Sequence, residues 1–152
     1  MEKNLLDLLL LGQQKADLQI IKECNQYTQR FGLMLSDTNV LDLLHSRREV
    51  LKEEERIEFQ GGILSKLIYE FCDSPYIYQD NYVDTLEELQ RIFYLYKNES
   101  LDELSDDELI TFMKAHFDGI CQGSLEHLED TCLYQLCRKG RSGYRYRDLL
   151  EE

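Results

Sequence analysis

Five side chains that could bind a metal lie within 22 positions near the C-terminal end of the sequence: His116, Cys121, His127, Cys132 and Cys137. Thiolates and imidazoles are the ligands that zinc prefers, but the spacing disfavours a site. At about 100° per residue on an α-helix, His127 and Cys132 are about 140° apart around the axis, and Cys137 lies about another 140° further on. Because no Cys-x-x-Cys or His-x-x-x-His pair is present, the sequence predicts structural Cys and His side chains, no metal site and no cofactor.

Cys121 is the one thiol expected on a loop, between Gly119 and Ser124. A thiol that precedes a helix N-terminus can have a lowered pKa, because the positive end of the helix dipole favours the thiolate. With His116 or His127 as its base, Cys121 would be a candidate nucleophile. The alternative, a partly buried cysteine in a glycine-bounded turn, is favoured because activation needs a geometry that spacing does not specify.

The segment from Tyr69 to Tyr96 holds eight Tyr and Phe residues with carboxylates interleaved. Tyrosine combines a rigid apolar body with a polar tip, which suits binding surfaces and pocket linings. The favoured alternative is a tyrosine-rich edge of the core, whose hydroxyls reach water or carboxylates. If the segment does bind a ligand or a protein, the candidate residues are Tyr69, Asp73, Tyr76, Tyr78, Asp80 and Tyr82, together with Cys121 of the loop.

Helices must position these residues, because apolar side chains recur with helical periodicity along most of the chain. Gly32 predicts a helix end. Three Ser/Thr-x-x-Glu capping boxes predict helix or turn starts at Thr85, Ser100 and Ser105, and Ser124 predicts the cap of a last helix. We therefore expect an all-α fold: a single compact bundle-like domain of about six or seven helices, with short loops and a short basic C-terminal tail.

The net charge of −13 is unevenly distributed. Residues 1–137 carry 12 basic and 27 acidic side chains, whereas residues 138–147 carry five basic side chains and no acidic one. We predict an acidic helical domain over 1–137 and a basic then acidic tail over 138–152, which folds back onto the acidic body or onto a neighbour in a dimer. An acidic body repels phosphates, so neither nucleic acid nor an anionic membrane surface is expected as a partner.

The distribution of apolar residues and cysteines predicts a cytoplasmic protein. No segment approaches the roughly 18–20 apolar residues that a membrane-spanning helix needs. The N-terminal leucines lack the features of a secretory signal. The five cysteines are odd in number and irregularly spaced, which is typical of reduced thiols.

Three motifs resemble those of a family of small uncharacterised bacterial proteins, over about two-thirds of the chain. They are Arg56–Leu64, Phe71–Ile77, and Phe117–Gly119 with Cys121–Ser124. The resemblance transfers no catalytic or binding residue, and it implies only a bacterial and cytoplasmic setting. Within the first motif, Gly61-Gly62 is expected to form a turn that lets helices pack closely, in preference to an anion site at a helix N-terminus.

These observations favour a non-enzymatic cytoplasmic protein that acts by binding another protein or a second copy of itself. The hypothesis rests on a tyrosine-rich acidic segment without a recognisable catalytic or phosphate-binding motif. The alternative is a small enzyme or small-molecule binder that uses the Tyr69–Tyr96 region or the Cys121 loop.

Overall fold

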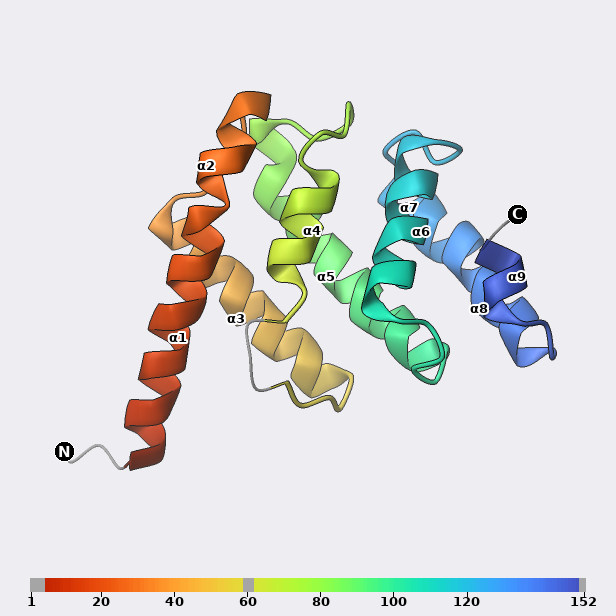
Figure 1. Ribbon diagram of the computed structural model, residues 1–152, viewed down its shortest axis with the longest axis horizontal. Coiled ribbons are helices and arrows are strands. Elements are labelled where there is room, and N and C mark those ends of the chain that lie inside the picture. The colour runs from red at the N-terminus through yellow and green to blue at the C-terminus, as the bar shows by residue number, and fades with distance from the viewer. Residues whose placement is uncertain (1–4, 59–61, 151–152) are drawn as a thin grey trace.

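The computed structural model describes residues 5–58 and 62–150, and within the first helix it describes the side chains from residue 12 onward. The helices are α1 (Leu5–Glu23), α2 (Asn25–Thr28), α3 (Asp37–Glu53), α4 (Leu64–Phe71), α5 (Tyr82–Glu99), α6 (Asp106–Asp118), α7 (Leu125–His127), α8 (Tyr134–Arg141) and α9 (Tyr146–Leu150) (Figure 1). Short 3-10 turns η1 (Gln29–Phe31) and η2 (Gln79–Asn81) lie between them, and a π-helical turn, η3 (Leu128–Leu133), joins α7 to α8. The predicted all-α class is confirmed, with seven helices if the nearly continuous α1–α2 and α7–α8 runs each count once.

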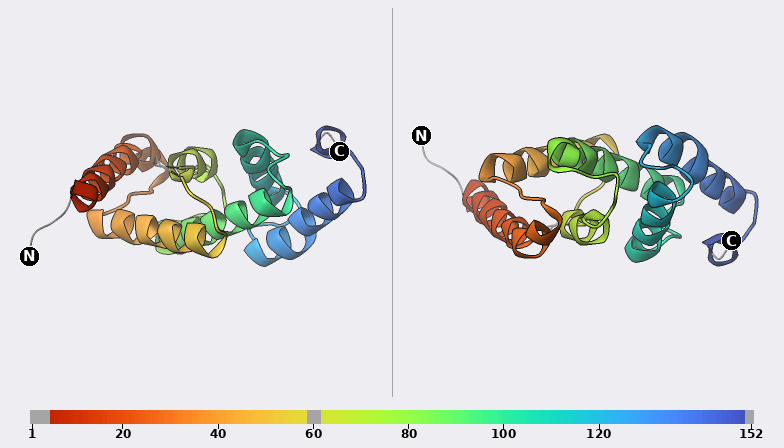
Figure 2. Two further views of the ribbon diagram at one scale, coloured as in Figure 1. Left: turned by 90° about the horizontal axis from the view of Figure 1, so that it is seen from below. Right: turned by 90° about the horizontal axis from the view of Figure 1, so that it is seen from above.

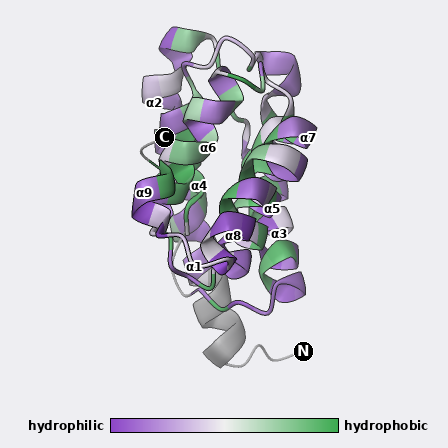
Figure 3. Cartoon of the chain, turned by 90° about the vertical axis from the view of Figure 1, so that its right-hand side faces the viewer, coloured by the Kyte–Doolittle hydropathy of each residue, from purple (hydrophilic) through white to green (hydrophobic). Residues whose placement is uncertain are grey.

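The helices form two layers that face each other along the length of the molecule. Views from below and above place α1, α4, α6 and α9 in one layer and α3, α5 and the α7–α8 run in the other (Figure 2). Apolar stretches gather between the layers, and the outer faces are largely hydrophilic (Figure 3). Each helix thus buries one stripe against its neighbours across the layer boundary. No helix in the described part of the chain has both the length and the apolar character that crossing a membrane requires.

Several predicted helix ends are confirmed. Gly32 adopts a left-handed conformation (φ 77°) at the end of η1. The Ser105 hydroxyl accepts a hydrogen bond from the backbone N–H of Glu108, which completes the capping box of α6. Ser124 caps α7 in the same way. The expected start at Thr85 is wrong, because α5 begins at Tyr82.

The cause of the earlier start of α5 is tertiary packing. Tyr82 is 1% exposed and belongs to the hydrophobic core, so its burial favours a helix that includes it. Thr85 is buried within the helix. A local capping signal was therefore overridden by burial of an aromatic side chain three residues earlier.

The basic stretch after residue 137 makes one ion pair with the acidic body in the described part of the chain. The predicted division at residue 137 falls inside α8, which continues to Arg141. Arg141 forms an ion pair with Glu99 at 2.6 Å. Further along, the Tyr146 ring lies against Gly140, where an added Cβ would meet its Cζ at 2.1 Å, and its hydroxyl donates to the Cys137 carbonyl. A side chain at position 140 would therefore require the Tyr146 ring to move.

The glycine turn expected at Gly61-Gly62 is described only at Gly62, since Gly61 lies outside the described residues. Gly62 has φ 69°, and an added Cβ would lie 2.5 Å from the Arg47 Nε. Arg47 is nearly buried and forms an ion pair with Glu58 at 3.0 Å. The close approach of a buried arginine agrees with the expected packing role of this glycine.

Candidate metal centre

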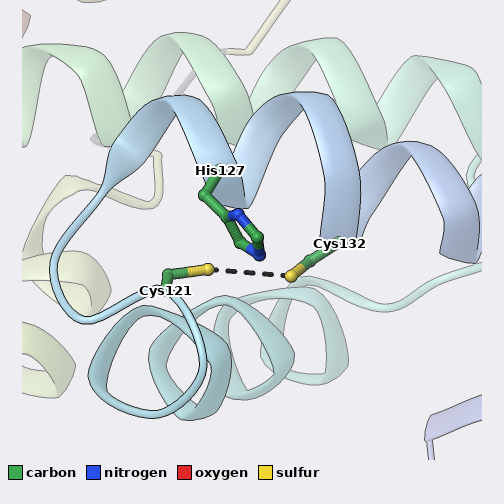
Figure 4. A group of neighbouring side chains, drawn as sticks. All are labelled: Cys121, His127 and Cys132. Atoms are coloured by element: carbon green, nitrogen blue, oxygen red, sulfur yellow. Dashed lines mark hydrogen bonds between the residues drawn. The ribbon is translucent and has the colours of Figure 1, made fainter.

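Cys121, His127 and Cys132 converge at the start of the α7–α8 run. One ligand atom from each side chain lies within 4.8 Å of the other two. Figure 4 shows the three side chains pointing toward one another, Cys121 from the loop after α6 and the other two from the helical run. The two Sγ atoms are 3.6 Å apart. In the described part of the chain, no fourth His, Cys, Asp or Glu joins this group.

The expected separation of His127 and Cys132 is wrong, because the backbone between them is not α-helical. Residues 128–133 form the π-helical turn η3. A π-helix closes hydrogen bonds from i to i+5 and takes more residues per turn than an α-helix, so residues five apart come onto nearly the same face. Cys137 follows on the regular helix α8 and stays outside the cluster, in the hydrophobic core.

Two side chains of α5 hold the π-helical turn in place. The Tyr96 hydroxyl donates to the backbone carbonyl of Glu129 at 2.6 Å. The Arg91 guanidinium forms two hydrogen bonds with the Glu129 carboxylate, at 2.7 and 2.8 Å, which lower the pKa of Glu129. A side chain that takes a helix carbonyl in this way is an established cause of irregular helical turns. Tyr96 and Arg91 are therefore positioning residues for His127 and Cys132.

The loop that carries Cys121 is fixed by backbone hydrogen bonds and by one glycine. The Cys121 N–H donates to the His116 carbonyl at 3.0 Å, and the Gly123 N–H donates to the Phe117 carbonyl at 2.8 Å. Gly123 has φ 83°, and an added Cβ would lie 2.6 Å from the Cβ of Tyr76. Tyr76, a predicted binding residue, therefore packs behind the loop and supports it.

Burial disfavours the thiolate form of one member of the cluster, Cys121. Cys121 is 5% exposed, and burial together with the hydrogen bond to Cys132 raises its pKa. The lowered pKa that a nucleophilic Cys121 would need is therefore not found, because desolvation disfavours the thiolate. The favoured alternative, a buried cysteine in a glycine-bounded turn, agrees with this burial. His127 Nε2 is buried and has no hydrogen-bond partner within the described part of the chain. An unsatisfied buried imidazole nitrogen facing two thiols is the arrangement that a cation would complete.

The sulfur–sulfur distance fits a shared metal ion. Two thiolates bound to one tetrahedral zinc at about 2.3 Å each are separated by about 3.8 Å. The 3.6 Å between Cys121 Sγ and Cys132 Sγ is close to this value, and far from the roughly 2.05 Å of a disulfide. The described cysteines are all free thiols. The separation of the two sulfurs is therefore compatible with a shared ion.

A groove of about 410 Å³ borders the cluster. His127 and Cys132 lie at one part of its lining, and Thr131, Gln135 and Lys139 continue it along the helical run. His116 also lines the groove, stacked on Phe112 with ring centroids 3.9 Å apart. The polar row was missed from the sequence, although the spacing of residues 131, 135 and 139 places them on one helical face.

The structure does not bring the predicted tyrosines together with the cluster, apart from Tyr76. Tyr82 is buried, Tyr78 is 61% exposed and Tyr69 is 48% exposed on α4. Asp80 is exposed on η2. Asp73 forms an ion pair with Lys114 at 2.7 Å. These candidates therefore point to several environments, and their binding role stays a prediction.

Residues 20–146 match the model of a family of unknown function, DUF6323. The chain belongs to this family. The matched region includes all three residues of the DUF6323 metal-centre candidate and most of its groove. No curated protein and no solved structure matches the chain.

Proposed function

We propose that this DUF6323 protein binds a zinc ion through Cys121, His127 and Cys132. The observation that carries the proposal is the convergence of the three ligand atoms within 4.8 Å. Two further observations support it: the 3.6 Å separation of the sulfurs and the buried, unpartnered Nε2 of His127. This proposal replaces the prediction of no metal site, which assumed a regular α-helix between His127 and Cys132.

The chemistry of the ligands favours zinc over harder cations. Two thiolates and an imidazole suit soft or borderline ions, whereas calcium and magnesium prefer oxygen ligands. Structural zinc sites close the tetrahedron with a fourth protein ligand, but catalytic sites leave that position for water or a substrate. With three ligands supplied and a groove alongside, the site resembles the second kind.

The test is a metal analysis of purified protein together with zinc titration under reducing conditions. Wild type is expected to retain zinc by elemental analysis and native mass spectrometry. Cobalt(II) in its place should give the absorption of tetrahedral thiolate coordination. Cys121→Ala, Cys132→Ala and His127→Gln should each weaken zinc binding at least about 100-fold, since even changes to outer partners of metal ligands cost 10–100-fold.

Cys137→Ala is the matched control. Cys137 lies on the same helical run, is buried as Cys121 is, and takes no part in the cluster. The Cys137→Ala variant should be somewhat less stable than wild type and should bind zinc with the same affinity. Wild-type protein that binds zinc no more tightly than the Cys121→Ala variant would overturn the proposal.

We propose, as a second function, that the protein binds another protein or a second copy of itself. The observation that favours it is an aromatic cluster on the surface, formed by Tyr27, Phe31 and Tyr69, which are 39–48% exposed. The Tyr27 ring lies 5.8 Å from that of Phe31 and 5.6 Å from that of Tyr69. Exposed aromatic side chains of this kind are enriched at protein interfaces. We propose that this binding takes place in the cytoplasm of a bacterium.

Size measurement and pull-down test the second function. Wild type should elute as an oligomer or recover a partner, and Tyr27→Ala with Tyr69→Ala should abolish the association. Tyr78→Ala, which removes an exposed tyrosine outside the cluster, serves as the control. A monomer that recovers no partner would count against this function and leave the zinc proposal unaffected.

A further inference from the structure

The groove beside the metal centre has the size and the mixed lining of a small-molecule site. Its volume of about 410 Å³ falls within the roughly 300–1,000 Å³ that such sites occupy. Phe112, Ile120 and Leu136 supply apolar wall. The polar groups lie on the helical run, where Gln135 and Lys139 continue the line that starts at the cluster.

The charge of this lining differs from that of the chain. Among the described residues that line the groove, none is Asp or Glu, although the chain carries a net charge of −13. A second hollow, beside Tyr69, shows the opposite character, since Glu70 and Asp107 contribute to its lining. An anion in the groove would therefore meet no carboxylate among the described residues that line it.

One cation in the groove, Lys139, and one in the neighbouring hollow, Arg138, are available to an anion. Within the described part of the chain, neither Lys139 nor Arg138 forms an ion pair. The next cation along the helix, Arg141, is paired with Glu99 at 2.6 Å. A neighbouring hollow of about 350 Å³ shares Gln135 and Lys139 with the groove and adds Arg138. The available positive charge is thus concentrated at one end.

The metal centre lies at the other end of the line of residues that leads to Lys139. Cys132 and Lys139 are seven residues apart, which corresponds to about 10 Å along a helix and to nearly the same face. Both residues line the groove. A ligand that engages both must therefore be elongated, with different chemistry at its two ends.

We propose that the groove binds a small organic anion that lies along α8, with its anionic group at Lys139 and a metal-binding donor atom at the Cys121–His127–Cys132 end. Contact with the metal rests on the proposed zinc site, whereas recognition of the anion by Lys139 does not. Phe112 and Leu136 pack against the carbon chain between the two ends. A carboxylate and a phosphate ester share the chemistry that Lys139 recognises.

The test compares ligands that are matched except for their charge. Zinc-loaded protein is titrated calorimetrically with 6-mercaptohexanoate and with 6-mercaptohexanol, whose thiols can bind the metal. Protein without metal is titrated with hexanoate, hexyl phosphate and hexanol, followed by NMR. The anions should bind about two- to fivefold more tightly than the alcohols, the range for an exposed charge pair. Whichever of hexanoate and hexyl phosphate binds more tightly identifies the anionic group.

Lys139→Gln should remove the preference for the anions and leave the affinity for the alcohols unchanged. Lys52→Gln is the control, since Lys52 is also an exposed lysine in the last turn of a helix and lies outside this groove. Equal binding of anions and alcohols by wild type would overturn the inference while leaving zinc binding intact. If the protein binds no zinc, a Lys139-dependent preference for hexanoate or hexyl phosphate supports the anion site by itself, and its absence overturns it.

Discussion

The Tyr69–Tyr96 region and the Cys121–Cys132 segment differ in whether their functional side chains converge on one point. In the first, Tyr94 is fully buried and its hydroxyl donates to the Glu58 carboxylate at 2.9 Å, while the Tyr96 hydroxyl donates to the Glu129 carbonyl. In the second, two thiols face each other and a buried imidazole nitrogen has no partner in the described part of the chain. A segment rich in functional side chains is therefore not in itself a binding site. A site also needs functional groups that point toward one another and are free to bind a ligand.

The two regions also depend on each other. Tyr76 packs behind the Cys121 loop, and Tyr96 holds the carbonyl of the π-helical turn. Part of the tyrosine-rich region thus supports the metal-centre candidate instead of forming a site of its own. Substitutions can distinguish residues that support the metal-centre candidate from residues that bind the ion.

The largest effect is expected where the two regions touch. Gly123→Ala should destabilise the protein by about 3 kcal/mol, because it combines the cost of a left-handed conformation with a clash against Tyr76. For a chain of this length, that corresponds to a fall in Tm of about 6–12 °C, measured by thermal unfolding.

Gly143→Ala is the control for that change. Gly143 also has a positive φ, of 100°, but an added Cβ there meets nothing within 4 Å. Only the conformational cost, about 1 kcal/mol, is expected. Equal losses for the two variants would mean that the contact between Tyr76 and the loop contributes nothing.

Zinc should stabilise the folded chain by about 2.7 kcal/mol when its concentration is 100 times the dissociation constant. Thermal unfolding with and without a chelator should then differ by about 5–11 °C in Tm. Cys132→Ala should abolish this difference, whereas Tyr78→Ala should keep all of it. If zinc does not change the Tm of wild type, the Cys121–Cys132 segment is no more a metal site than the Tyr69–Tyr96 region.

Substitution by phenylalanine at two neighbouring tyrosines of α5 should have different effects on stability and on zinc affinity. Tyr94→Phe breaks a hydrogen bond to a carboxylate and should cost about 1.5–3 kcal/mol of stability without changing zinc affinity. Tyr96→Phe breaks a bond to a carbonyl and should cost only about 1 kcal/mol, but it should weaken zinc binding about tenfold. Denaturant unfolding and zinc titration of both variants measure the two quantities.

The smallest effect is expected at the exposed tyrosines. Tyr69→Ala and Tyr78→Ala should change stability by less than about 0.5 kcal/mol, as surface substitutions usually do, and should leave zinc affinity unchanged. Thermal unfolding and zinc titration measure both quantities. A large loss of zinc binding in either variant would show that this region contributes to the metal centre.

Much of the local structure could be predicted from the sequence. The helix ends at Gly32, Ser105 and Ser124 follow from backbone geometry and from hydrogen bonds that span at most three residues. The start of α5 could not be predicted in this way, because burial of Tyr82 depends on helices distant in the chain. A helix end that depends on nearby residues can be predicted from the sequence. A helix end that depends on packing against distant helices cannot.

The sequence by itself determined the all-α class, the helix caps and the residues from which a site could be built. Only the tertiary structure decided that His127 and Cys132 share a face, because α5 supplies the Tyr96 hydroxyl and the Arg91 guanidinium that hold the π-helical turn. Those contacts join residues 33 and 38 positions apart. Helical periodicity describes a regular backbone, and a long-range hydrogen bond that changes the backbone also changes which side chains meet.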